Sequence, residues 1–309
     1  MQKEIKMKRT HWFSLMTILI CLLLLGMGTK AAPEGTDSTA TKQNEDKPTS
    51  QPANELNLDL GNKVTMKLVL LPAGQFVMGS PEDEKGREAT EGPRHGVRIT
   101  RPFYMGACEV TQEQYQQVMG ENPSKSKGAS KPVEKVSWHD AAEFCKKLSQ
   151  KTRRQVALPT EAQWEYACRA GSAGPYCFGD DENKLGDYAW YVYNSEMESH
   201  RVGQKKPNAF GLYDMHGNLS EWCRDWFADS YARAGAKDPT GPASGTQRVV
   251  RGSSFGDIPR HCRCADRSGA PPDMKVSSVG FRVVMNVEAG GVKAASDLSA
   301  HAAVAGSVD

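Results

Sequence analysis

The loss of helical periodicity after Gly171 is the sequence feature that most restricts how this chain can fold. Beyond this residue glycine, proline, asparagine, aspartate and aromatic residues dominate, a composition typical of ordered loops rather than helices. Two strand patterns interrupt the loops, at residues 247–251 and 280–285. Few helices and many loops around short strands predict an α+β fold.

The first half of the chain combines strand patterns with helix starts. Apolar residues alternate over residues 64–70, and further strand patterns occur at 76–78 and within 97–103. A Ser or Thr followed three residues later by Gln or Asp marks a helix N-terminus, because each side chain accepts a hydrogen bond from the other residue's backbone amide. This signal predicts three helices, beginning after Thr111, Ser137 and Thr160.

The two ends of the chain are expected to lie outside the folded domain. Residues 1–31 have the order of a secretory signal peptide, with a basic start, an apolar segment and small residues at the end. Residues 32–58 and 288–309 hold few large apolar side chains, so a disordered linker and a disordered tail are predicted. The domain between them spans residues 59–287. We expect an exported protein (periplasmic, cell-surface or extracellular), with membrane contact only through an uncleaved signal anchor.

Charge and cysteine content restrict the classes of partner and the redox compartment to be expected for this chain. The chain has 39 Lys and Arg against 37 Asp and Glu, a net charge of +2. It therefore lacks the basic excess that favours a nucleic-acid partner. Eight cysteines are present, and seven remain once Cys21 leaves with the signal peptide. In an oxidising compartment this odd number predicts up to three disulfides and one free thiol.

Six sequence blocks occur in a characteristic order. They are EVTQEQY at 109–115, VSWHDA at 136–141, LPTEAQWEYACRAG at 158–171, GLYDMHGNLSEWCRDW at 211–226, RGSSF at 251–255 and VGFRV at 279–283. In this order they resemble the formylglycine-generating enzyme (sulfatase-modifying factor) family, and the match covers nearly all of residues 64–285. The resemblance implies a single C-type-lectin-like domain with much irregular loop structure, which agrees with the α+β prediction.

The resemblance also sets an expectation for the chemistry. The family's enzymes oxidise a sulfatase cysteine to formylglycine, using oxygen and a copper ion held by two cysteines just beyond the RGSSF block. In this chain residues 256–261 contain no cysteine. Ser254 is retained, whereas Ser220 and Ser278 stand where the family has a tryptophan and an asparagine. No copper site is therefore expected.

The remaining cysteines allow two alternatives. Cys262 and Cys264 alternate along the chain, so on a strand their sulfurs would face the same side and form a displaced copper site, with Ser254 as a further catalytic candidate. The family resemblance instead implies that Cys168 and Cys264 form a structural disulfide. Cys262 would then pair with Cys223 or stay free.

The loop at residues 214–221 resembles a calcium site of the family. The matching positions imply side-chain ligands at Asp214 and Glu221 and carbonyl ligands at Gly217 and Leu219, a mixture of hard oxygen donors that suits calcium. The alternative is a loop in which the two carboxylates cap backbone amides. His216 lies in the same loop without the spacing of a metal-ligand set, so it is not expected to bind a metal.

Polar residues after the RGSSF block are expected to form a ligand-binding face. Arginines suit carboxylate, sulfate or phosphate groups, and the alternative is a solvated edge with internal salt bridges. The predicted face consists of Ser254, Asp257, Arg260, His261, Arg263 and Arg267.

These observations favour one function and leave two alternatives. We expect an exported binding or accessory protein that recognises a peptide, a glycan or an anionic ligand and has lost the oxidase chemistry. One alternative is an active oxidoreductase, which generates formylglycine or carries out a related oxidation with displaced copper. The other is a receptor resembling the lectin-like variable proteins of diversity-generating retroelements, but residues 254–278 lack the Asn- and Tyr-rich substitution that would favour it.

Overall fold

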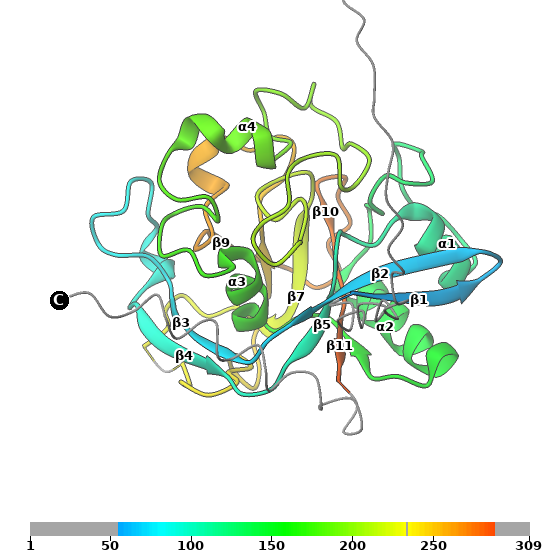
Figure 1. The fold of residues 1–309 in the computed structure, drawn as a ribbon, viewed down its shortest axis with the longest axis horizontal. Helices are drawn as coiled ribbons and strands as arrows, with labels where there is room; N and C mark the ends of the chain where they lie inside the picture. The colour runs from blue at the N-terminus through cyan, green and yellow to red at the C-terminus, as the bar shows by residue number, and fades with distance from the viewer. Residues whose placement is uncertain (1–54, 233, 288–309) are drawn as a thin grey trace, which may run out of the picture. The chain divides into compact units, whose positions relative to one another are not determined.

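The structure is a computed structural model that describes residues 55–287 except Arg233. The predicted signal peptide and tail, and the predicted linker up to residue 54, lie outside the described residues. Short strands in three sheets combine with short helices and long loops, so the predicted α+β class is confirmed (Figure 1). Within the described part, no helix is long and apolar enough to cross a bilayer.

The largest sheet joins the two ends of the domain. Its strands follow the order β1-β2-β5-β11-β6, and all neighbours are antiparallel. The strands are β1 (Glu55–Gly61), β2 (Val64–Leu71), β5 (Phe103–Gly106), β11 (Val284–Asn286) and β6 (Val156–Ala157). The β1–β2 hairpin turns at Asn62 and Lys63, whose positive φ values of 53° and 66° match the twist of a tight hairpin turn.

The remaining strands form two smaller sheets. The four-stranded sheet has the order β10-β7-β8-β9, with β10 parallel to β7 and the other pairs antiparallel. The last sheet pairs β3 with β4. The strands are β10 (Val279–Gly280), β7 (Ser220–Trp226), β8 (Arg248–Arg251), β9 (Arg267–Ala270), β3 (Gly74–Met78) and β4 (His95–Ile99).

All three predicted helix starts are confirmed. Thr111, Ser137 and Thr160 each accept a hydrogen bond from the third residue of the helix, whose own side chain bonds back to the cap. The α-helices are α1 (Gln112–Met119), α2 (Trp138–Thr152), α3 (Glu161–Arg169) and α4 (Leu185–Tyr188). The 3-10 turns are η1 (Ala89–Glu91), η2 (Glu182–Lys184) and η3 (Pro259–His261).

Two large apolar clusters fill the domain. In the first, α1 and α2 pack against the large sheet around Tyr115, Phe144 and Phe281, whose rings contact one another. In the second, α3 buries Trp164 and Cys168 between the sheets. Truncating a buried aromatic residue of this kind costs about 3–5 kcal/mol. The second cluster fixes α3, and α3 positions the residues described below.

The structure differs from the sequence prediction at three places. β1 begins at Glu55, before the predicted domain start, because Leu56 and Leu58 pack on the first cluster. The sequence predicts loop over residues 220–226, whereas these residues form the strand β7. The predicted strand at 280–285 is two strands, β10 and β11, which belong to different sheets.

Candidate functional site

A polar hollow of about 170 Å³ opens beside the loop that follows β8. The loop reverses tightly, because the Ser254 amide and hydroxyl both donate to Asp257 Oδ2, at 2.7 and 2.8 Å. Ser254 is thereby buried inside its own loop. The polar and charged side chains that line the hollow are those of Ser220, Arg251, Ser253, Asp257, His261, Asp266 and Ser268, and Arg251 is buried in an ion pair with Glu165.

Hydrogen-bond acceptors dominate the hollow. His261 Nδ1 lies 3.2 Å from Asp266 Oδ1, and its Nε2 accepts from Arg260 Nε at 3.0 Å. Burial raises the pKa of Asp266 to about 6, although His261 opposes that rise. Asp257 adds a second carboxylate. Such a site suits ligand N–H and O–H groups better than an anion.

Two predicted members of the ligand face are buried in internal ion pairs, so the prediction was wrong for them. Arg263 donates to Glu84 at 2.6 Å and to both oxygens of Glu91 at 2.6 and 2.9 Å. Arg267 donates to both oxygens of Glu161 at 2.6 and 2.8 Å. Buried carboxylates satisfy both guanidinium groups and hold them away from solvent. Arg260 is exposed, and Asp257 and His261 are half-buried beside the hollow.

Exposed apolar side chains form a rim next to the hollow. Tyr193, Met197 and Ile258 are 72%, 60% and 40% exposed, and they are three of the four exposed large apolar side chains among the described residues. Backbone contacts join their loops, since the Val192 amide donates to the Asp257 carbonyl at 3.1 Å. The apolar rim, defined as Tyr193, Met197 and Ile258, therefore lies on two loops that contact each other at Asp257, and its three side chains stand outside the lining of the hollow itself.

Cys262 and Cys264 lie in different apolar clusters, so the alternative of a displaced copper pair does not fit the arrangement of the two thiols. The two residues lie in a bend and a turn rather than a strand, so the alternation argument fails. Cys262 packs in a small cluster with Tyr176, and its thiol faces the Ile258 carbonyl at 3.6 Å. Cys264 faces Cys168 in the second large cluster.

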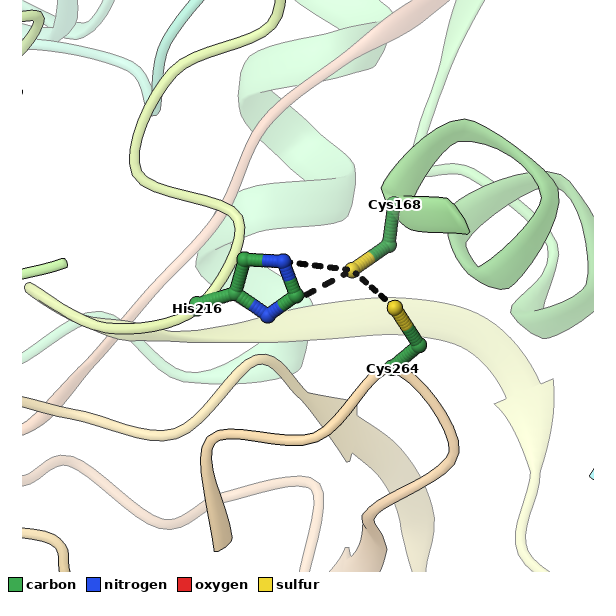
Figure 2. A group of neighbouring side chains, drawn as sticks. All are labelled: Cys168, His216 and Cys264. Carbon is green, nitrogen blue, oxygen red and sulfur yellow. Dashed lines mark hydrogen bonds between the residues drawn. The ribbon is translucent and has the colours of Figure 1, made fainter. Parts of the chain in front are cut away.

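Cys168, Cys264 and His216 instead form a buried group that sequence reasoning missed (Figure 2). The Sγ atoms of Cys168 and Cys264 lie 3.6 Å apart, and Cys168 Sγ lies 4.0 Å from each ring nitrogen of His216. Both sulfurs are thiols in this structure, and a disulfide would need a distance of about 2.05 Å. The predicted bridge between Cys168 and Cys264 stays a prediction.

A second buried group surrounds Asp214. Its Oδ2 accepts from the Gly203 amide at 2.7 Å, whereas Oδ1 and the neighbouring Glu109 Oε2 are buried without a hydrogen-bond partner. Burial raises the pKa of Asp214 to about 6, although the hydrogen bond from the Gly203 amide and the charge of Arg282 both act to lower it. Burial and the Asp214 charge also raise the pKa of Glu109. Two orphaned carboxylate oxygens in one buried place call for a cation or a shared proton.

Residues 59–287 match the family model described as the sulfatase-modifying factor enzyme 1-like domain. The chain belongs to this family. It is 30% identical over 281 residues to the formylglycine-generating enzyme of Streptomyces coelicolor, covering 69% of this chain and 87% of that enzyme.

Two solved structures share the fold. PvdO from Pseudomonas aeruginosa has a TM-score of 0.70 and 31% identity, and the match covers 77% of this chain and 100% of PvdO. Treponema denticola variable protein 1 has a TM-score of 0.69 and 31% identity, and the match covers 75% of this chain and 99% of that protein.

The copper that formylglycine-generating members of this family hold does not fit the residues present here. The segment from Gly256 to His261 offers a carboxylate and an imidazole in place of two thiolates. The next sulfur along the chain, that of Cys262, faces the interior against the Ile258 carbonyl. No soft pair therefore lies at the surface of the hollow.

The residues at the family's calcium-binding positions fit a calcium ion in part. Asp214 offers its orphaned oxygen, and Glu109 adds one that the sequence did not suggest. Glu221 is less free, because both its oxygens accept from Arg282 at 2.7 to 2.9 Å and Oε2 also accepts from Trp164. Gly217 packs so closely on the Trp190 carbonyl that a Cβ atom would overlap it, which fixes the course of the loop.

Proposed function

We propose that this protein is an exported, non-oxidase member of the family that binds an extended peptide segment of a partner protein. The observation that carries the proposal is the apolar rim beside the acceptor-rich hollow, on one surface of the loops at residues 192–198 and 254–261. Apolar rim side chains suit a partner's apolar side chain, and the hollow suits its N–H donors.

The chemistry of the surface favours a peptide over an anion. Arg251, Arg263 and Arg267 are all paired internally. The other ionisable groups at the hollow are Asp257, Asp266 and His261, beside the exposed Arg260. Tyrosine is enriched among residues that dominate binding energy, and methionine adapts its shape to varied partners. The relative from Streptomyces coelicolor is named for making formylglycine, a residue of a polypeptide, so a polypeptide ligand also agrees with the family.

The test uses the full chain and a phage-displayed library of random peptides. Selected peptides should bind the unchanged chain and lose about tenfold or more in affinity with Tyr193→Ser or Met197→Ser. Val77→Ser is the matched control, because Val77 is the fourth exposed large apolar side chain among the described residues, 44% exposed and on β3. Failure to select any peptide, or equal losses with Val77→Ser, would overturn the proposal, as would selective binding of glycans on an array.

The absence of oxidase activity needs its own assay. The chain is incubated with copper, a thiol reductant, oxygen and a peptide carrying a sulfatase-type C-x-P-x-R segment. We expect no aldehyde on the peptide cysteine, because oxidation by oxygen needs a redox centre and the hollow offers no thiolate pair. An aldehyde product that disappears with Cys262→Ser or Cys264→Ser would restore the oxidoreductase alternative.

We also propose that Asp214 and Glu109 help to bind calcium, with Gly217 and Leu219 as carbonyl ligands. The buried orphan oxygens support this, because a cation would compensate them. An ion bound only by the native chain, at a hundred times its dissociation constant, adds about 2.7 kcal/mol of stability. Chelation should therefore lower the melting temperature, and Asp214→Ala should remove the response. An unchanged melting temperature in chelator would refute the site.

A further inference from the structure

We propose that a cavity beside the start of α3 binds a small primary amine with an apolar body, and that Asp225 holds the ammonium group of this ligand. The cavity has a volume of about 650 Å³, which lies within the range of sites for small organic molecules. It shares no lining residue with the hollow described above, so the proposal does not depend on the proposed peptide surface.

The Asp225 carboxyl group lines this cavity and has one oxygen left for a ligand. The residue is only 4% exposed, and its Oδ2 accepts from the Glu161 amide at 3.0 Å. No described residue donates a hydrogen bond to Oδ1. On this side of the carboxyl group lies Gly241, where a Cβ atom would come to 3.0 Å from Oδ1. Because glycine has no side chain, the space beside the oxygen stays open.

The other buried charged groups of the lining already have partners. Arg267 donates to both oxygens of Glu161, at 2.6 and 2.8 Å. The hydroxyl of Tyr231 donates to Glu161 Oε1 at 2.9 Å. Among the buried, described residues of the lining, Asp225 Oδ1 is therefore the carboxylate oxygen that remains for a ligand.

Apolar side chains line much of the rest of the cavity. The buried ones are Met78, Ala162 and Tyr231, and Trp226, Ala228 and Pro242 lie nearer the surface. The apolar body of a ligand would displace water from these side chains, which is favourable. An apolar lining also lowers the local dielectric constant, so an ion pair with Asp225 is stronger there than at an exposed surface.

A positive group suits this carboxyl group better than a neutral or a negative one. Burial raises the pKa of Asp225 to about 7, and the Glu161 carboxylate adds to the rise. An ammonium group that donates to Oδ1 stabilises the ionised form, so binding below this pH releases the Asp225 proton to solvent. The ion pair that results is neutral, as a buried place requires. A carboxylate ligand would instead meet Glu161 and Asp225 with no unpaired buried cation beside them.

The test titrates 2-phenylethylamine into the full chain and follows binding by NMR, with 2-phenylethanol as the neutral probe of the same size. At pH 8 we expect saturable binding of the amine, roughly tenfold or more tighter than binding of the alcohol. Asp225→Asn keeps an acceptor for the Glu161 amide and should abolish this preference. Asp229→Asn is the matched control, because Asp229 is exposed, lies four residues further along the chain and does not line the cavity.

The pH dependence of the affinity separates ligand binding from a structural role of Asp225. In the unchanged chain the affinity for the amine should rise roughly tenfold per pH unit from pH 5 to about pH 7 and then level off, because one proton is released. The other charged or imidazole groups that act on Asp225 or line the cavity are Glu161, Arg224, Arg267, His95, Lys237 and Asp238. The same titration in Asp225→Asn measures their contribution and should lack the tenfold rise.

A photoreactive probe locates the site in the unchanged chain, so this measurement holds even where a substituted chain fails to fold. 2-Phenylethylamine with a diazirine group on its ring should label peptides that contain Met78, Ala162 or Tyr231, detected by mass spectrometry, and the unlabelled amine should compete. Labelling confined to residues 192–198 and 254–261 would overturn the proposal. So would the absence of saturable binding, equal binding of amine and alcohol, or a preference for the amine that persists in Asp225→Asn.

Discussion

Asp225 should make the domain less stable as the pH rises from about 4 to about 7. This residue of β7 is buried, and its Oδ2 accepts from the Glu161 amide at 3.0 Å, at the first turn of α3. Burial raises its pKa from 3.8 to about 7, and the Glu161 carboxylate adds to the rise. The folded chain therefore keeps a proton that the unfolded chain loses near pH 4.

The sign and the size follow from this difference. Between about pH 4 and pH 7 the folded state binds more protons than the unfolded state, so stability falls as the pH rises. A shift of about three units at 1.36 kcal/mol each gives a loss on the order of 4 kcal/mol across this range. Asp225→Asn keeps an acceptor for the Glu161 amide and cannot ionise, so this part of the loss should disappear.

Urea unfolding, followed by tryptophan fluorescence from pH 4 to pH 8, measures the effect. The free energies of unfolding of the two chains should diverge with rising pH, and Asp225→Asn should be the more stable chain at pH 8. Subtracting the two curves isolates Asp225, because the other titrating groups are common to both. Parallel curves over the whole range would refute the assignment of a buried, protonated Asp225.

Three further predictions concern stability and oxidation. Arg282→Met should lower the free energy of unfolding in urea by about 3–5 kcal/mol, because it leaves the buried Glu221 carboxylate unpaired. Adding Glu221→Gln should recover part of this loss, and an unchanged unfolding midpoint in Arg282→Met would contradict the prediction. Gly217→Ala should destabilise the domain by about 1–3 kcal/mol, since a Cβ would overlap the Trp190 carbonyl, whereas Gly96→Ala has open space and should not. In oxidised exported protein, non-reducing peptide mapping should recover Cys168 joined to Cys264, and finding both alkylatable there would contradict the bridge.

Local features of the fold were predictable from the sequence, because the groups that decide them are close in the chain. Each helix start depends on a cap and a residue three positions later, and all three were found. β7 was not predicted because four of its seven residues are buried, three of them (Glu221, Trp222 and Cys223) in succession, so the alternation of a half-exposed strand is missing. The strand at 280–285 was misjudged because no local pattern tells which sheet a short apolar run will join.

The site was harder to predict, because its geometry comes from contacts between distant segments. Arginines are usually exposed, and nothing near Arg263 in the sequence reveals that Glu84 and Glu91 would surround it. In the buried group of Cys168, His216 and Cys264, Cys168 is 48 positions from His216 and 96 positions from Cys264. The one local signal was the placing of Cys168 and His216 within blocks of the family pattern, whereas Cys264 was linked to Cys168 only through the family resemblance.

The position of β11 determines when the domain can finish folding. Of the described strands this one is the last to be synthesised, yet it is paired on both sides, with β5 and β6, in the largest sheet. Until β11 emerges from the ribosome, β5 and β6 each keep an unpaired backbone edge. Pairing between segments so far apart in the sequence forms slowly. For the same reason, a nonsense mutation near residue 283 would remove a strand that is paired on both sides and would leave β5 and β6 without a partner between them.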